Sequence, residues 1–195
     1  FTVDQDSDIE KIIEAYAQDP SVEYAEPNYR TEVFLSPNDT YYNTPNDPGS
    51  WGQTYDDLWG LKPDKMNLEA AWDLAQGEGI VVAVVDTGLD YTRPDIAANV
   101  WQNTAEIPDN GLDDDGNDYV DDASGWDFVN DDNDPLDDFG HGTHVSGTIA
   151  AVGNNGIGIV GVAPQSKIMA LKGLGDDGSG STDGLAQAIM YAADN

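Results

Sequence analysis

Two histidines and one aspartate stand in positions that suit acid–base chemistry. His141 and His144 are the only histidines of the chain, and Asp86 follows an apolar run and precedes Thr87-Gly88. The carboxyl end of such a strand is where α/β proteins build their sites. An aspartate that orients a histidine makes it a general base, which is one interpretation of Asp86 and His141. Two alternatives stay open: Asp86 ends a strand in a tight turn, or the histidines form a zinc pair, for which the sequence offers no third ligand.

The composition excludes several classes of function. The 195 residues carry 38 acidic and 7 basic side chains, a formal net charge of −31. Such a charge repels phosphate backbones, so we expect no nucleic-acid partner. No apolar run approaches the ~18 residues that a membrane span needs. The absence of cysteine excludes disulfides, thiolate–zinc sites and a cysteine nucleophile.

The elements that must position these residues alternate between strand and helix after residue 66. The apolar runs 80–85 and 168–171 predict strands, the first of them buried on both faces of a parallel sheet. Helices are predicted from Asn67, as an N-cap, to Gly77, over about 142–151, and after the cap Ser181. Residues 109–138 form an Asp-rich loop. The alternation predicts an α/β fold.

The N-terminal part has a different pattern. Residues 7–10 form a capping box, and apolar residues at 9, 12, 13 and 16 predict one helical face. A short strand is predicted at 22–25. From about 28 to 65 the sequence is rich in Asn, Asp, Pro and Gly, which predicts irregular structure that contains a domain boundary.

Three segments in the later part resemble the motifs of subtilisin-like serine proteases. They are Val-Val-Asp-Thr-Gly-Leu-Asp at 84–90, His-Gly-Thr-His-Val-Ser-Gly-Thr at 141–148 and Gly-Val-Ala-Pro at 161–164. They occur in that family's order, Asp before His, and the resemblance covers residues 37–195. It implies a three-layer fold around a parallel sheet and an endopeptidase that cleaves proteins or peptides. Asp86 would be the triad acid, His141 the general base and His144 a structural residue.

The same resemblance implies roles for two further segments. Gly178, Ser179 and Gly180 match the segment that pairs with the substrate backbone as an extra strand; the alternative is a plain glycine turn. Residues 19–27 resemble the end of the inhibitory propeptide, which acts as an intramolecular inhibitor; the alternative is an unrelated extension. We therefore expect an α+β propeptide remnant at 1–34 and a peptidase domain at 35–195, in a secreted protein that is a monomer.

No serine of the chain stands in the Gly-Thr-Ser-x-Ala setting of the family's nucleophile. The family's oxyanion-hole asparagine would follow just after Asn195. We therefore expect the N-terminal half of a catalytic domain, truncated before the nucleophile and inactive alone; a degenerate homologue is the alternative. The rival functions are a non-catalytic, acidic calcium-binding module and a zinc hydrolase built on the two histidines.

Structural calcium is a further implication of the resemblance. No lysine or arginine lies between Arg93 and Lys167, so the acids there either meet water or recruit cations. The medium-affinity loop of thermitase-like members maps onto Asp127, Asn130, Asp132 and Asp134. A stronger site maps onto Asp95, the side chain of Asn155 and the carbonyl groups of Val152, Ile157 and Ile159. Asp39 resembles the N-terminal ligand of that site, and Asp47 and Asn154 compete with Asp39 and Asn155.

A third acidic segment has its own spacing. Asp113, Asp115, Asn117 and Asp121 lie at alternate positions, like the start of an EF-hand loop. Asp118 stands where such a loop needs glycine, and no glutamate follows at the twelfth place. A calcium site and a solvated acidic loop therefore both stay open.

Overall fold

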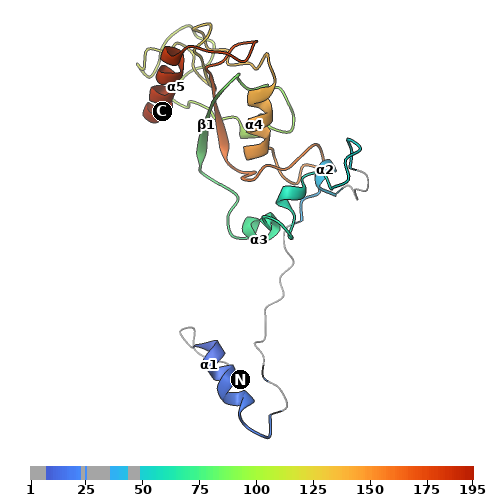
Figure 1. Ribbon diagram of the computed structural model, residues 1–195. Helices are drawn as coiled ribbons and strands as arrows, with labels where there is room; N and C mark the ends of the chain where they lie inside the picture. The colour runs from blue at the N-terminus through green and yellow to red at the C-terminus, as the bar shows by residue number, and fades with distance from the viewer. Residues whose placement is uncertain (1–7, 23–24, 26–35, 44–48) are drawn as a thin grey trace. The chain divides into compact units, whose positions relative to one another are not determined.

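The computed structural model describes residues 8–22, 25, 36–43 and 49–195, apart from the side chains of residues 9, 10 and 43. The chain divides into two compact units, Phe1–Val33 and Phe34–Asn195. The first contains α1 (Ile9–Ala17), whose N-cap is Asp8: its carboxylate accepts a hydrogen bond from the N–H of Lys11 at 3.3 Å (Figure 1). Ser7 and residues 23 and 24 of the predicted strand at 22–25 lie outside the described residues.

A parallel sheet of three strands forms the centre of the second unit. β1 (Val81–Asp86) and β2 (Gly125–Asp127) both pair with β3 (Lys167–Lys172), in the order β1-β3-β2. The register places Asp86, the last residue of β1, beside Lys172, the last residue of β3. The predicted parallel α/β sheet is confirmed. The sequence does not predict β2, because its three residues lie in the segment 109–138, which is expected to be an acidic loop.

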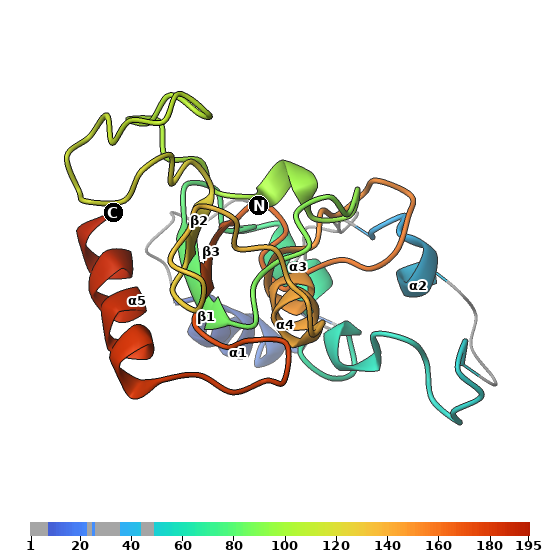
Figure 2. The ribbon, with the colours of Figure 1, turned by 90° about the horizontal axis from the view of Figure 1, so that it is seen from above.

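Helices cover both faces of the sheet, so the unit has three layers (Figure 2). Ile168 and Ala170 of β3 belong to the cluster that includes Val145 and Ile149 of α4 (His141–Ala150). Their neighbours on β3, Met169 and Leu171, point the other way, into the cluster with α5 (Thr182–Asp194). All four β3 residues are buried, as expected for a central parallel strand.

The helix ends agree only in part with the sequence. Ser181 caps α5 as predicted, since its hydroxyl accepts a hydrogen bond from the N–H of Gly184 at 2.9 Å. The predicted cap of α3 is wrong. Asn67 adopts φ +54° and makes no side-chain cap bond, and α3 covers only Leu68–Trp72. A capping side chain needs an extended backbone at the N-cap, which Asn67 lacks.

The remaining elements are short. α2 (Thr40–Asn43) precedes two 3-10 helices, Trp59–Leu61 and Ala97–Asn99. Tyr42 packs with Leu68 and Trp72 of α3 and with Val160, which fixes the start of this unit against the loop after α4. Among the described residues, no helix is long and apolar enough to span a bilayer.

Candidate active site

Asp86 and His141 meet where β1 ends and α4 begins. Nδ1 of His141 lies 2.8 Å from one carboxylate oxygen of Asp86 and 2.9 Å from the other. A carboxylate can only accept, so Nδ1 carries the proton, and in the neutral imidazole Nε2 has a free lone pair. Asp86 is buried, whereas the imidazole side chain is 60% exposed, which leaves Nε2 open to a reactant. This is the geometry of a base with the acid that orients it.

Glycine lets the two elements approach each other so closely. A Cβ on Gly142 would lie 2.2 Å from the carbonyl oxygen of Gly88 and 3.2 Å from Cβ of Asp86. Gly140, on the other side of His141, has φ +100°, a conformation that glycine adopts without strain. The glycines that flank His141 in the sequence therefore permit the close approach of α4 to β1.

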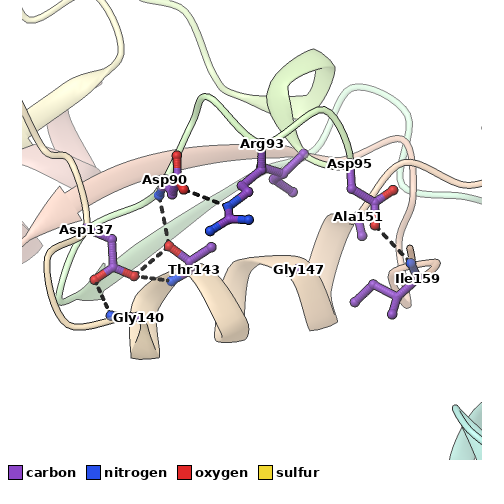
Figure 3. Close-up of a pocket in the computed structure, with 10 residues that line it drawn as sticks. Asp90, Arg93, Asp95, Asp137, Gly140, Thr143, Gly147, Ala151 and Ile159 are labelled. Carbon is purple, nitrogen blue, oxygen red and sulfur yellow. Dashed lines mark hydrogen bonds and ion pairs between the residues drawn. The ribbon is translucent and has the colours of Figure 1, made fainter. Parts of the chain in front are cut away.

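Asp137 organises the turn that leads into α4 (Figure 3). Its carboxylate accepts the backbone N–H groups of Phe139, Gly140 and Thr143 at 3.0, 2.8 and 2.8 Å. It also accepts the hydroxyl groups of Thr87 and Thr143 at 2.8 and 2.5 Å. Burial raises the pKa of Asp137, but the hydrogen bonds from Thr143, Gly140 and Phe139 outweigh it and lower the pKa to about 2. Asp137 is therefore an ionised carboxylate at a helix N-terminus, where the helix dipole favours it.

A pocket of about 460 Å³ lies along α4, between that helix and the segment that carries Asp90, Arg93 and Asp95 (Figure 3). Its wall includes Asp137 and Thr143 but neither Asp86 nor His141. The exposed face of the imidazole is thus separate from this pocket, and we place no chemistry in it.

The predicted substrate segment follows β3, at the end of the sheet where Asp86 lies. Gly178 has φ +75°, and the N–H of Gly175 donates to the carbonyl group of Ser179 at 2.8 Å. A Cβ on Gly178 would lie 3.2 Å from the ring of Phe139, which stands two residues before His141. Gly180 passes close to β3, since a Cβ there would lie 2.0 Å from the carbonyl oxygen of Gly173. The segment forms a glycine turn that lies beside Phe139, and pairing with a substrate stays a prediction.

The residues of the predicted stronger calcium site lie together. The fully buried carboxylate of Asp39 accepts the N–H groups of Asn154 and Asn155 at 2.9 and 3.3 Å. Asp95 accepts the side-chain amide of Asn155 at 2.8 Å and the N–H of Ile159 at 2.9 Å. Within the described ranges, neither carboxylate has a lysine or arginine partner. Two carboxylates that approach the loop 152–159 from separate segments, with no basic side chain beside them in the described ranges, fit a hard divalent ion.

The competing assignments of this site differ in their contacts. The side-chain oxygen of Asn154 accepts the N–H of Asn38 at 3.1 Å, away from Asp95, whereas Asn155 contacts Asp95 directly. The N–H of Val152 donates to the carbonyl group of Asp95, and that of Ile157 to the side chain of Asn155. Asp47 lies outside the described residues.

In the predicted loop 127–134, the carboxylates of Asp127 and Asp132 accept hydrogen bonds from within the loop itself. Asp127 is buried and accepts the N–H groups of Val129 and Asn130 at 2.7 and 2.9 Å and the side-chain amide of Asn130 at 3.0 Å. Asp132 accepts the N–H of Asp134, which in turn accepts the hydroxyl of Tyr91. In the part of the chain that the structure describes, these carboxylates do not gather within ion-sharing distance. Here they shape a turn.

A carboxylate cluster is instead formed by Glu106, Asp113 and Asp115, whose ligand oxygens all lie within 4.8 Å of one another. Sequence reasoning names two of these residues and misses Glu106, because an isolated glutamate seven residues before an acidic run carries no spacing signal. Asn117 and Asp121 support the loop: Asn117 donates to Asp122 at 2.9 Å, and Asp121 accepts the N–H groups of Asn110 and Gly111, both at 2.9 Å. The spacing of the cluster suits a metal ion.

Comparison with known proteins identifies the family of this chain. The family profile described as the Subtilase family matches residues 77–195, more than half of the sequence. The chain belongs to the subtilase family. A second profile, the fervidolysin N-terminal prodomain, matches residues 1–28. The resemblance that the sequence motifs carry is confirmed.

Relatives of this subtilase are serine proteases. It is 38% identical over 196 residues to the thermophilic serine proteinase of Bacillus sp. (strain AK1), which covers 100% of this chain and 40% of the relative. It is 38% identical over 151 residues to thermitase of Thermoactinomyces vulgaris, with 77% and 44% of the two chains covered. A solved protease of Pseudoalteromonas arctica PAMC 21717 superimposes with a TM-score of 0.57 and 31% identity, over 81% of this chain and 44% of that one. The subtilase chain therefore spans less than half the length of each of them.

Proposed function

We propose that this subtilase chain supplies the acid and the base of a serine endopeptidase, Asp86 and His141. The nucleophilic serine and the oxyanion donors would come from residues that follow position 195 in the complete protein. One observation carries the proposal: Nδ1 of His141 lies 2.8 and 2.9 Å from the two oxygens of Asp86, while the imidazole stays exposed. The zinc alternative is not favoured, because among the described residues the groups that gather at ion-sharing distance are Glu106, Asp113 and Asp115, without His141 or His144.

The chemistry follows from the protonation of the imidazole. Nε2 of His141 accepts the proton of the serine hydroxyl group as the oxygen attacks the peptide carbonyl carbon. The same nitrogen then gives the proton to the leaving amine, and a water molecule repeats the sequence to release the acyl group. Asp86 keeps the proton on Nδ1 in the resting state and stabilises the imidazolium that forms.

The proposed organisation of the precursor has two parts. Residues 1–34 are the C-terminal part of an inhibitory propeptide, and 35–195 are the N-terminal half of the peptidase domain. The prodomain match at 1–28 and the unit boundary between Val33 and Phe34 support this division. The propeptide is cut between Asn28 and Pro37, and the mature protein is a secreted monomer in which residues 178–180 pair with the substrate backbone.

Structural calcium belongs to the same proposal. Asp39, Asp95, Asn155 and the carbonyl groups of the loop 152–159 would hold one ion, and the cluster of Glu106, Asp113 and Asp115 a second. A bound cation would relieve the repulsion within a chain of net charge −31. The loop 127–134 stays a weaker candidate.

The test compares the 195-residue chain with the complete protein in casein and fluorogenic-peptide hydrolysis, with a serine-directed phosphonate as the label. We expect the complete protein to hydrolyse and to be labelled, and the chain alone to do neither. Labelling of the chain at one of its own serines would contradict the proposal. A complete protein that binds calcium but never hydrolyses peptides would favour the non-catalytic alternative.

N-terminal sequencing of the mature protein tests the precursor organisation. We expect a mature N-terminus between Asn28 and Pro37. A mature chain that still begins upstream of Glu10 would refute the propeptide assignment.

A further inference from the structure

Thr87 lies at the junction between the acid-bearing strand and the base-bearing helix. It follows Asp86 and is 1% exposed. Its N–H donates to Oδ1 of Asp86 at 2.7 Å, and its hydroxyl oxygen accepts the N–H of Gly142, the residue after His141, at 2.9 Å. One residue thus contacts the carboxylate on one side and the helix turn that carries the imidazole on the other.

Asp137 holds the hydroxyl group of Thr87 and the same helix turn. The hydroxyl donates to Asp137 at 2.8 Å, which fixes its rotation so that its lone pair faces Gly142. Asp137 also accepts the N–H of Gly140 at 2.8 Å, so the residues on both sides of His141 in the sequence are attached to Thr87 directly or through one carboxylate. The Thr143 hydroxyl that donates to Asp137 in turn accepts the N–H of Asp90 (Figure 3).

Lys172 holds the opposite side of Thr87. Lys172 is 1% exposed, and its ammonium group donates to the carbonyl oxygen of Thr87 at 2.9 Å. It also donates to the carboxylate of Asp138 at 2.6 Å and to the carbonyl group of Leu174 at 3.3 Å. A buried ammonium group with three oxygen partners is fully satisfied, and it links the end of β3 to the end of β1.

We infer that Thr87, held through its hydroxyl group by Asp137 and through its carbonyl group by Lys172, is the positioning residue that sets the distance and orientation between Asp86 and His141. This inference rests on the proposed function, because it assigns no chemistry of its own to Thr87. Its physical basis is that the N–H of this buried residue contacts Asp86, its hydroxyl group contacts Asp137 and the helix turn that carries His141, and its carbonyl group is held by Lys172 of β3. Loss of the hydroxyl alone leaves the buried N–H of Gly142 without its acceptor and frees the turn to shift.

The decisive variants separate the hydroxyl group of Thr87 from the shape of its side chain. Thr87→Val keeps the β-branched shape and removes the donor and the acceptor, whereas Thr87→Ser keeps both. We expect Thr87→Val in the complete protein to lower kcat per titrated active site by about 10- to 100-fold, the effect of a misplacement of order 1 Å, with KM changed less than about twofold. Thr87→Ser should restore kcat to within about threefold of the wild type, because both hydrogen bonds are kept. Thr148→Val is the matched control. It removes a hydroxyl group from α4, the helix that carries His141, where that group donates to the carbonyl group of His144.

Asp137→Asn provides an independent test, because it perturbs the position of His141 through the helix turn and not through Thr87 itself. The amide nitrogen must face at least one N–H that the carboxylate accepted, so we expect a fall in kcat of similar size. Since both variants break one network, the double variant Thr87→Val/Asp137→Asn should be much less impaired than the product of the single effects predicts. The NMR chemical shift of the proton on Nδ1 of His141 gives a second readout. We expect a low-field resonance in the wild type, an upfield shift in Thr87→Val and the wild-type shift in Thr87→Ser.

The outcomes separate this inference from the proposed function. An inactive wild-type complete protein would refute the proposed function before any variant is compared. An active wild type whose Thr87→Val variant keeps kcat and the Nδ1 resonance unchanged would overturn the inference alone. A thermal midpoint that falls while kcat per active site stays constant would assign Thr87 a structural role and overturn it as well.

Discussion

Replacement of the acid of the proposed couple, Asp86→Asn, should abolish most of the turnover while the fold persists. The N–H of Thr87 at 2.7 Å requires an acceptor, so the asparagine oxygen occupies the Oδ1 position. The amide nitrogen then replaces Oδ2, which lies 2.9 Å from Nδ1 of His141. A donor at that place competes with the remaining oxygen, 2.8 Å from Nδ1, and populates the tautomer with a bare Nδ1 and a protonated Nε2, which cannot accept a proton from serine.

The size of the loss follows from charge and tautomer together. Two unit charges about 4 Å apart attract by about 4 kcal/mol at an effective dielectric constant of about 20. Loss of that stabilisation of the imidazolium slows turnover by about 10³-fold. The wrong tautomer adds to this, and the corresponding change in a serine-protease triad reduces kcat by about 10⁴-fold. We therefore expect a fall in kcat between about 10³- and 10⁴-fold.

The assay measures kcat on a fluorogenic peptide and the thermal midpoint of the complete protein, with the propeptide removed by an external protease so that maturation does not limit the variant. Asp90→Asn is the matched control, because it removes the same charge four residues later in the chain, where Asp90 pairs with Arg93 at 2.7 Å. The control should keep kcat within about threefold, since screened surface charges contribute little. An Asp86→Asn variant with kcat within tenfold of the wild type and an unchanged thermal midpoint would refute the reasoning.

Three other perturbations have defined outcomes. Exhaustive chelation should lower the thermal midpoint of the complete protein, and Asp39→Asn and Asp113→Asn, one at each proposed ion, should each reproduce part of the loss. An unchanged midpoint would exclude the proposed ions. A ligand at 100 times its Kd stabilises the fold by about 3 kcal/mol. Gly142→Ala places a Cβ 2.2 Å from the carbonyl oxygen of Gly88, so activity should fall more than about tenfold, and wild-type kcat would contradict the close packing. Leu171→Ala leaves a cavity at a fully buried position and should lower the free energy of unfolding by about 2–5 kcal/mol in chemical denaturation. Leu74 is 89% exposed, so Leu74→Ala should lower it by less than about 0.5 kcal/mol, and equal losses would contradict the assigned core.

Local sequence signals account for the parts of the fold that were predicted. The apolar run 80–85 and the Ser181 cap act within a few residues of themselves, so β1 and α5 follow from them. β2 could not be predicted, because its three residues become a strand only through pairing with β3, more than 40 residues later. Asn67 carries the residue type of a cap, but its backbone conformation is set by the turn before α3.

The site divides in the same way. Residue type and motif predict Asp86 and His141 as site residues, but only the structure shows that they are in contact. Asp137 could have been nominated from its place four residues before His141, where an acid suits a helix N-terminus. The clustering of Glu106 with Asp113 and Asp115, and the hydrogen bonds of Thr87 to Asp137 and Lys172, depend on how distant segments pack. No spacing in one sequence encodes these contacts.

The most direct test of the account removes the proposed base. In the complete protein, His141→Ala should reduce kcat by about 10⁴- to 10⁶-fold and slow labelling of the nucleophilic serine by a phosphonate to a similar extent, because no group remains to accept its proton. The thermal midpoint should stay close to that of the wild type, since the imidazole side chain is 60% exposed. A folded His141→Ala protein that keeps wild-type turnover and wild-type labelling would contradict the central claim that Asp86 and His141 form the acid–base couple of this subtilase.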